Sequence, residues 1–279
     1  MKLLRFTPLI ALTLVGGLTA ADFPTGTAAA GNHPVVQEPA GHSGQPVYRT
    51  DFEELIAKMI ERHGGAERLD AVQALSFDLL PIELSRDEEG ELVEEVGTKL
   101  HYEMTIGKER RVRIEETLED RQFVKLSTEK GIAIFMDGEP QNLAELRTVA
   151  NEQSLAVLRH LDAAYGLFSG RLTATPGKIR KRDGVNYATA ACELADSKVD
   201  SRVLLYVHPT ELAVQRYDVF DSDNRRQATV VLGEFIDLDG FPMATEITFS
   251  GRDREPIRRW RLEAVKTPKE LPADRFLKP

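Results

Sequence analysis

The 279-residue sequence contains a single cysteine, Cys192, and this scarcity excludes whole classes of site. One cysteine can form neither an intramolecular disulfide nor a multi-cysteine metal site. Cys192 alternates with Ala188, Ala190 and Leu194 on one face of a predicted strand. No basic side chain in this stretch would activate the thiol, so we expect a buried packing residue.

The sequence also lacks the common catalytic and metal-binding motifs. Its six histidines form neither H-x-x-x-H nor H-E-x-x-H, and no G-x-S-x-G is present. We therefore expect no metal, no cofactor and no enzymatic activity. A hydrolase whose carboxylates are distant in sequence is a third hypothesis, because a single chain does not reveal such a site.

Charge of one sign is never concentrated in this sequence. The formal net charge is −9, the arginines are scattered, and no five like charges are consecutive. Nucleic-acid backbones are bound by clustered lysines and arginines, so we expect no nucleic-acid partner. With 42% hydrophobic residues the chain can bury a sizeable core, which predicts a globular protein.

Only one long apolar run is present, and it lies near the amino terminus. A basic start, "MKLLR", precedes the apolar residues 6–15, and small residues follow at "LTAA" and "TAAA". This pattern predicts a signal peptide over 1–21, cleaved after Ala21 or Ala30. An uncleaved anchor is the alternative, although a membrane span needs roughly 20 apolar residues. No cysteine follows the run to accept a lipid, so we expect a soluble protein in the periplasm or another extracytoplasmic space. We also expect a monomer.

The rest of the chain divides into a flexible leader over 22–49, rich in Gly, Pro and Ala, and a folded domain over 50–279. The domain opens with a helix, "TDFEELIAKMIERHGG", which Gly64 and Gly65 end. Alternating apolar residues then predict about 11 strands in two groups. Between the groups, leucines at helical spacing over 142–170 predict one broken helix or two. No linker separates the groups, which favours an α+β fold with one continuous antiparallel sheet and helices on one face.

Two local patterns resemble functional loops but are interpreted as hairpins. "DSDNRRQ" begins like a calcium loop, yet Arg225 occupies a ligand position and the required glycine is missing. "TPGKIRKRDG" lacks the first glycine and the spacing of a phosphate-binding loop.

The order of these elements resembles the LolA/LolB-like superfamily of periplasmic lipoprotein carriers. The resemblance rests on "ERHGGAERLDAVQALSF" after the first helix, "LYVHPTELAVQRYDVF", "GEFIDLDGFPMATEITFSG" and the closing "LPADRF". It implies a strongly curved antiparallel sheet, an unclosed barrel, with an N-terminal helix and a central helical lid. It also implies a non-enzymatic protein that binds a lipid or a lipoprotein acyl chain in an apolar half-barrel cavity. The alternative is an envelope structural or regulatory module with a filled core and an envelope protein as partner.

The last strands supply most of the candidate site residues. Apolar and polar residues alternate over 243–249 and over 260–264, so each of these two strands presents one apolar face. We assign Trp260, Leu262 and Ala264 to the apolar face of the second strand. The two faces form an apolar wall, and Phe276 is expected to close one end of it. The predicted ligand-cavity residues are Leu100, Tyr102, Met104, Leu158, Met243, Ile247, Phe249, Trp260 and Leu262. Arg259 and Arg261 are predicted either to form a rim for an anionic head group or to lie on a solvated strand face. The same apolar residues would equally pack a solid core.

Overall fold

The computed structural model describes residues 49–106, 109–167, 172–193, 202–238 and 240–278. The predicted signal peptide and nearly all of the predicted leader lie outside these residues.

Helices make up a small part of the described chain. They are α1 (Arg49–Arg62), α2 (Ala66–Ala71), α3 (Ala144–Tyr165) and the 3-10 helix η2 (Ala273–Phe276). Gly64 and Gly65 follow α1 with φ angles of 90° and 91°, which residues with a Cβ rarely adopt, so they end the first helix as predicted. The central segment is a single unbroken helix of 22 residues, α3, rather than the predicted broken helix or pair of helices.

All fifteen strands of the described residues belong to one antiparallel sheet. In chain order they are β1 (Ala74–Arg86), β2 (Leu92–Val96), β3 (Leu100–Thr105), β4 (Arg111–Leu118), β5 (Arg121–Thr128), β6 (Gly131–Met136), β7 (Glu139–Gln141), β8 (Ala174–Pro176), β9 (Arg180–Arg182), β10 (Val185–Glu193), β11 (Arg202–His208), β12 (Ala213–Phe220), β13 (Arg226–Leu238), β14 (Phe241–Ser250) and β15 (Pro256–Lys266). Eleven of these fifteen strands were predicted from alternation. The two stretches that resemble functional loops form hairpins, as predicted. "DSDNRRQ" contains the turn between β12 and β13, and "TPGKIRKRDG" contains the turn between β9 and β10.

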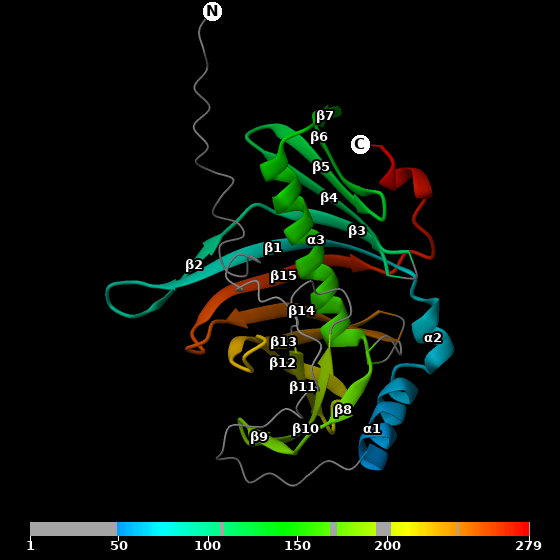
Figure 1. Ribbon diagram of the computed structural model, residues 1–279, viewed down its shortest axis with the longest axis vertical. Helices are drawn as coiled ribbons and strands as arrows, with labels where there is room; N and C mark the ends of the chain where they lie inside the picture. Colours follow the sequence, from blue (N-terminus) through cyan, green and yellow to red (C-terminus); the bar gives the residue numbers. More distant parts are fainter. Residues whose placement is uncertain (1–48, 107–108, 168–171, 194–201, 239, 279) are drawn as a thin grey trace, which may run out of the picture.

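The strand order places the two strand groups side by side. Across the sheet the order is β7-β6-β5-β4-β3-β1-β15-β14-β13-β12-β11-β10-β8, with β2 paired to β1 and β9 to β10. The first group therefore runs outward from β1 to one edge, and the second runs from the opposite edge back to β15. The helix α3 carries the chain from edge to edge, and β1 pairs with β15 in a central seam (Figure 1).

A proline lies in the central strand β1, where a missing N–H would normally break a ladder. Pro81 lies at the point where the partner of β1 changes from β3 to β2, and its carbonyl accepts the Gly97 N–H at 2.8 Å. In an antiparallel strand the N–H and C=O of one residue point to the same side. The missing N–H therefore faces this irregular junction, and the pairing of Pro81 with Trp260 of β15 is undisturbed.

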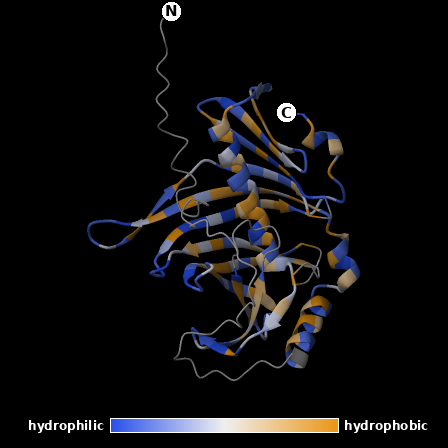
Figure 2. Cartoon of the chain, viewed as in Figure 1, coloured by the Kyte–Doolittle hydropathy of each residue, from blue (hydrophilic) through white to orange (hydrophobic). Residues whose placement is uncertain are grey.

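The sheet is curved and open, and α3 crosses its concave face (Figure 1). Hydrophobic and hydrophilic residues alternate along most of the longer strands, so these strands have an apolar face (Figure 2). The apolar faces and α3 enclose one hydrophobic core. The predicted class, an α+β half-barrel with an N-terminal helix and a central helix, is confirmed. Within the described residues, no helix is both long and apolar enough to span a bilayer.

A β-bulge in β15 corrects one predicted face. Opposite β1, the register shifts between the pairs Ser76–Lys266 and Asp78–Glu263. Ala264 has a φ of 50° and is exposed, whereas Val265 packs against the core. The prediction that Ala264 shares the face of Trp260 was wrong, because the extra residue of a bulge inverts the alternation beyond it.

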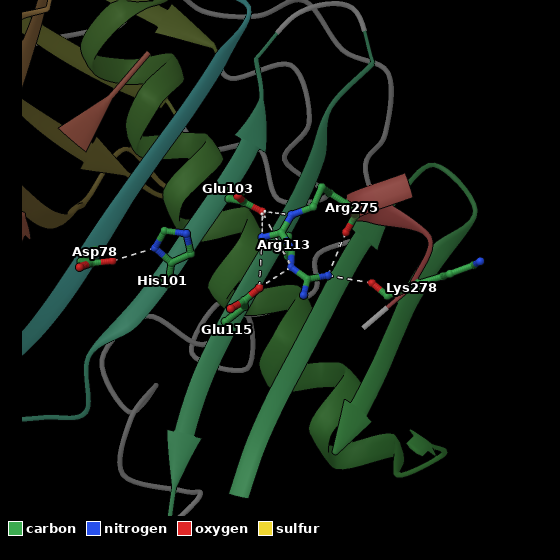
Figure 3. A network of polar contacts seen from close by, with 7 residues as sticks. All are labelled: Asp78, His101, Glu103, Arg113, Glu115, Arg275 and Lys278. Carbon is green, nitrogen blue, oxygen red and sulfur yellow. Dashed lines mark hydrogen bonds and ion pairs between the residues drawn. The ribbon is translucent and has the colours of Figure 1, made fainter. Parts of the chain in front are cut away.

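The opposite, convex face of β3 and β4 carries a network of ion pairs that holds the carboxyl-terminal segment (Figure 3). Arg113, only 4% exposed, donates to the main-chain oxygens of Arg275 at 2.9 Å and Lys278 at 2.8 Å. Its Nε also donates to Glu115 at 2.7 Å, and Arg275 pairs with Glu103 at 2.8 Å. These bonds fix η2 to the sheet.

Because of this attachment, Phe276 lies on the convex face of the sheet and not at the end of the concave wall, where the sequence placed it. Phe276 is buried in η2, which packs against β4 and β5 on the side of Arg113. The neighbours of Arg113 along β4, Val112 and Ile114, point the other way, into the core. Phe276 therefore covers the convex face and does not close an end of the concave wall.

A candidate ligand pocket beside the central helix

The described residues form a pocket where α2, the carboxyl-terminal half of α3, and the ends of β1, β3 and β14 meet. Its empty space is about 620 Å³, including the part open to solvent. The residues that line it are Leu69, Asp70, Val72, Gln73, Leu75, Ile106, Arg110, Leu158, Leu161, Asp162, Tyr165, Gly166 and Phe241. The elements α2, α3 and β14 are far apart in sequence, so only the fold brings the lining together.

The floor of the pocket is apolar and belongs to the main core. Leu75, Leu161, Tyr165 and Phe241 are all buried members of the core cluster. The rings of Tyr165 and Phe241 are 4.9 Å apart. A hydrophobic group that enters here would therefore meet the same apolar surface that α3 covers along the concave face.

A polar pair lies at the mouth. Arg110, just before β4, donates to both carboxylate oxygens of Asp162 on α3, at 2.7 Å and 2.6 Å. The two side chains are 23% and 19% exposed. This two-bond geometry is the strong form of an arginine–carboxylate contact, and it fixes α3 to the β3–β4 connection. This pair is therefore polar but neutral as a unit.

Two further polar contacts connect α3 to the sheet beneath it. Lys125 of β5 forms an ion pair with Glu116 of β4 and donates to Gln153 of α3 at 3.0 Å. At the other end of the helix, the Tyr165 hydroxyl accepts the N–H of Ala244 at 2.8 Å. Burial raises the pKa of Tyr165, so the phenol stays neutral. The helix is thus attached along its length by apolar packing and by hydrogen bonds.

His160 lies between these contacts, on the side of α3 that faces the sheet. Its Nδ1 is 3.2 Å from the hydroxyl of Tyr217, and its ring centroid is 6.2 Å from that of Trp260 and 6.5 Å from that of Tyr165. Burial lowers the pKa of His160 to about 4, so the ring is neutral at neutral pH. Its three ring neighbours, Tyr165, Tyr217 and Trp260, are all aromatic.

The predicted ligand-cavity residues lie mostly deeper than the pocket. Seven of them are core residues at most 7% exposed: Leu100, Tyr102, Met104, Met243, Ile247, Phe249 and Leu262. Leu158 and Trp260 are partly buried and pack against this core. Leu158 also lines the pocket, whereas the other eight predicted residues are not among the described residues around it. That these residues contact a ligand stays a prediction.

The two predicted rim arginines have different surroundings. Arg259 pairs with Glu94 at 2.7 Å and with Glu246 at 3.5 Å, and its side chain is 20% exposed. Arg261 is exposed on the same strand. Neither lies among the described residues that line the pocket, so the structure does not bring them to its mouth.

Sequence reasoning missed the residues that border the pocket mouth. Arg110 and Asp162 are 52 positions apart, and no local pattern relates a residue before a strand to one near a helix end. The part of the chain that the structure describes holds no group of three or more His, Cys, Asp or Glu side chains placed for a metal. Cys192 is buried, and burial raises its pKa to about 12, so it is a packing residue as expected.

Comparison with known proteins identifies the fold. No protein-family model matches the chain, and no curated protein matches it. Among solved structures, a DUF1329 family protein from Desulfovibrio piger superposes with a TM-score of 0.52 and 11% identity, covering 83% of this chain and 97% of its own. An outer membrane lipoprotein-sorting protein domain from Vibrio parahaemolyticus gives a TM-score of 0.49 and 10% identity, over 80% of this chain and 94% of that one. A LolA superfamily protein from Nitrosomonas europaea gives 0.48 and 13%, over 78% and 96%.

The chain shares the fold of the DUF1329 family protein, an open antiparallel half-barrel with a helix across its concave face. At identities this low the likeness concerns the fold alone.

Proposed function

We propose that this protein is an exported, non-enzymatic binding protein that holds an acyl chain, from a lipid or a lipoprotein, between α3 and the concave face of the sheet. The observation that carries the proposal is the pocket beside α3, whose apolar floor is continuous with the core. The chain would enter between α2 and α3, past the pair of Arg110 and Asp162.

The energetics of burial support such a ligand. Each methylene that leaves water contributes roughly 0.8 kcal/mol, which is about fourfold in affinity. Because part of the 620 Å³ is open to solvent, a long chain would also have to displace side chains under α3. Leu158 and Trp260, which are only partly buried, are the nearest candidates to move.

The test is a titration of the protein with a fluorescent fatty acid, followed by displacement with fatty acids of increasing length. We expect the dissociation constant to fall about fourfold per methylene and then to level off when the accessible space is full. Leu158→Trp should weaken binding, because the larger ring fills the pocket mouth. Ala156→Trp, on the exposed side of the same helix, is the matched control and should bind like the parent.

Two results would contradict the proposal. One is a parent protein that binds no fatty acid of any length. The other is equal affinity of the two tryptophan variants, since a pocket beside Leu158 cannot contribute if filling it changes nothing.

A second candidate function follows from the packing of the core. Because seven of the predicted cavity residues are buried against one another, the half-barrel can also serve as a rigid protein-interaction module in the envelope. Trp260→Ala separates the two functions. In a filled core it should lower the free energy of unfolding by about 3–5 kcal/mol, whereas in a ligand cavity it should weaken fatty-acid binding more than folding. Severe destabilisation, with no fatty-acid binding by the parent, would leave the interaction module as the better account.

A further inference from the structure

One buried histidine nitrogen in the core lacks a hydrogen-bond partner among the described residues. His160 is 3% exposed, and its Nδ1 faces the Tyr217 hydroxyl. Among the described residues, Nε2 of the same ring is buried and has no hydrogen-bond partner. A buried donor without an acceptor is costly, so a bound molecule that supplies the acceptor is favoured at this point.

The chemistry of the pair decides which nitrogen carries the proton. An imidazole nitrogen with a free lone pair is a better acceptor than a phenol oxygen, whose lone pair is delocalised into the ring. The Tyr217 hydroxyl therefore donates to Nδ1, and the hydrogen of the neutral imidazole is on Nε2. Burial raises the pKa of Tyr217 and lowers that of His160, so both groups are neutral at neutral pH.

The position of His160 connects this donor to the pocket. Tyr165 lines the pocket, and its ring lies edge-on to His160 at 6.5 Å. On another side, the partly buried Trp260 lies edge-on at 6.2 Å. His160 does not itself line the pocket, so a ligand would have to pass Tyr165 and displace Trp260 to reach Nε2.

We propose that Nε2 of His160 donates a hydrogen bond to the carbonyl oxygen of an ester- or amide-linked acyl group bound under α3. This inference rests on the proposed acyl-chain binding and adds a chemical preference to it. A hydrocarbon chain without a carbonyl would fill the same space and leave the donor unsatisfied. The site therefore selects acylated molecules over equally apolar ones.

The experiment compares a fatty-acid methyl ester with the n-alkane of the same number of chain atoms, which has no hydrogen-bond acceptor. Each displaces a bound fluorescent fatty acid from the parent protein, from His160→Phe and from His101→Phe. We expect the ratio of ester affinity to alkane affinity to be about tenfold higher in the parent than in His160→Phe, the value of one well-placed buried hydrogen bond. His160→Phe should bind the alkane like the parent and lose this preference for the ester. His101→Phe, altered on the partly exposed convex side, should keep it.

A second measurement needs no variant. The infrared carbonyl band of the ester bound to the parent should lie at lower wavenumber than that of the ester in hydrocarbon solvent, because a donated hydrogen bond weakens the C=O bond. An unshifted band, or the same ester preference in His160→Phe as in the parent, would overturn the inference while acyl-chain binding still stood. If the parent bound neither ligand, the proposed function would fail and this inference with it.

Discussion

At the scale of single residues, the ion pair of Lys125 and Glu116 places two charges inside the core, with side chains 6% and 2% exposed. Lys125→Met leaves the Glu116 carboxylate buried without its partner. We expect a loss of about 3–5 kcal/mol in the free energy of unfolding, measured by urea denaturation. Replacing both residues at once, Lys125→Met with Glu116→Leu, should recover most of this loss, because two apolar groups need no compensation.

The matched control is Lys58→Met, which breaks the exposed pair of Lys58 and Glu54 on α1. It should leave the denaturation midpoint almost unchanged, because water solvates both charges. If Lys125→Met were as mild as this control, Glu116 would have to be neutral or hydrated in the folded protein.

His160 gives the stability a pH dependence whose sign follows from its burial. Its pKa is lowered from 6.5 to about 4, so the folded state favours the neutral ring. Below pH 6.5 the histidine takes up a proton in the unfolded chain, but in the folded protein it does so only near pH 4. Protonation therefore favours the unfolded chain, and the free energy of unfolding decreases as the pH falls from 6.5 to about 4. From about pH 7.5 to pH 5, the free energy of unfolding of the parent should fall by about 2 kcal/mol more than that of His160→Phe.

Urea denaturation of both proteins at the two pH values measures this difference. The pKa of His63 is also lowered, chiefly by burial, but His63 is present in both proteins and cancels in the comparison. Parallel pH profiles would mean that His160 is hydrated or charged in the native state.

At the scale of elements, α3 is both the cover of the concave face and part of the core. Three consecutive positions test this arrangement: Val157 is 3% exposed, Leu158 is partly buried and Ala156 is exposed. Aspartate at these positions should lower the thermal midpoint most at 157, less at 158 and least at 156, with a few kcal/mol lost at Val157 because an unpaired charge leaves water there. Equal midpoints for the three variants would mean that α3 is not packed on the sheet.

The sequence predicted a strand correctly where the strand was long enough to show alternation and buried only one of its two faces. Eleven strands were found because each buries one face, as β3 does with its alternating buried and partly buried residues. The four missed strands give no such signal. The strands β7, β8 and β9 have three residues each, and all five residues of β2 are exposed. Alternation also fails beyond the bulge at Ala264, because nothing local marks the extra residue.

The candidate site was less predictable than the fold, for a related reason. Periodicity identifies which side chains point into the core, and the seven buried candidates do so. It does not identify where packing leaves a gap. The pocket depends on how α2, α3 and the strand ends meet, and the contact of Arg110 with Asp162 depends on the path of α3 across the sheet.

At the scale of the whole molecule, the central seam is the pairing that joins residues farthest apart in sequence. The other neighbouring long strands follow one another closely along the chain. Closing a long loop costs more entropy than closing a hairpin, so we expect the seam to form after the transition state. Leu79→Ala in the seam should mainly speed unfolding, whereas Ile134→Ala in the β5–β6 hairpin should slow folding more.

Both side chains are 2% exposed, so the two truncations remove comparable buried groups. Stopped-flow folding and unfolding rates over a range of urea concentrations separate the two effects. The order of events would be refuted by a Leu79→Ala variant whose folding rate falls more than that of Ile134→Ala.

The position of the seam also has a consequence during synthesis on the ribosome. Pro81 is translated long before its partner Trp260, which lies about 180 residues further along the chain, and at roughly 5–20 residues per second the interval is about 10–35 s. Throughout this time β1 has no strand on the side that β15 will occupy. An apolar strand with an open edge is a template for pairing with another chain. Association between two nascent copies therefore competes with folding until β15, in the last tenth of the chain, has been made.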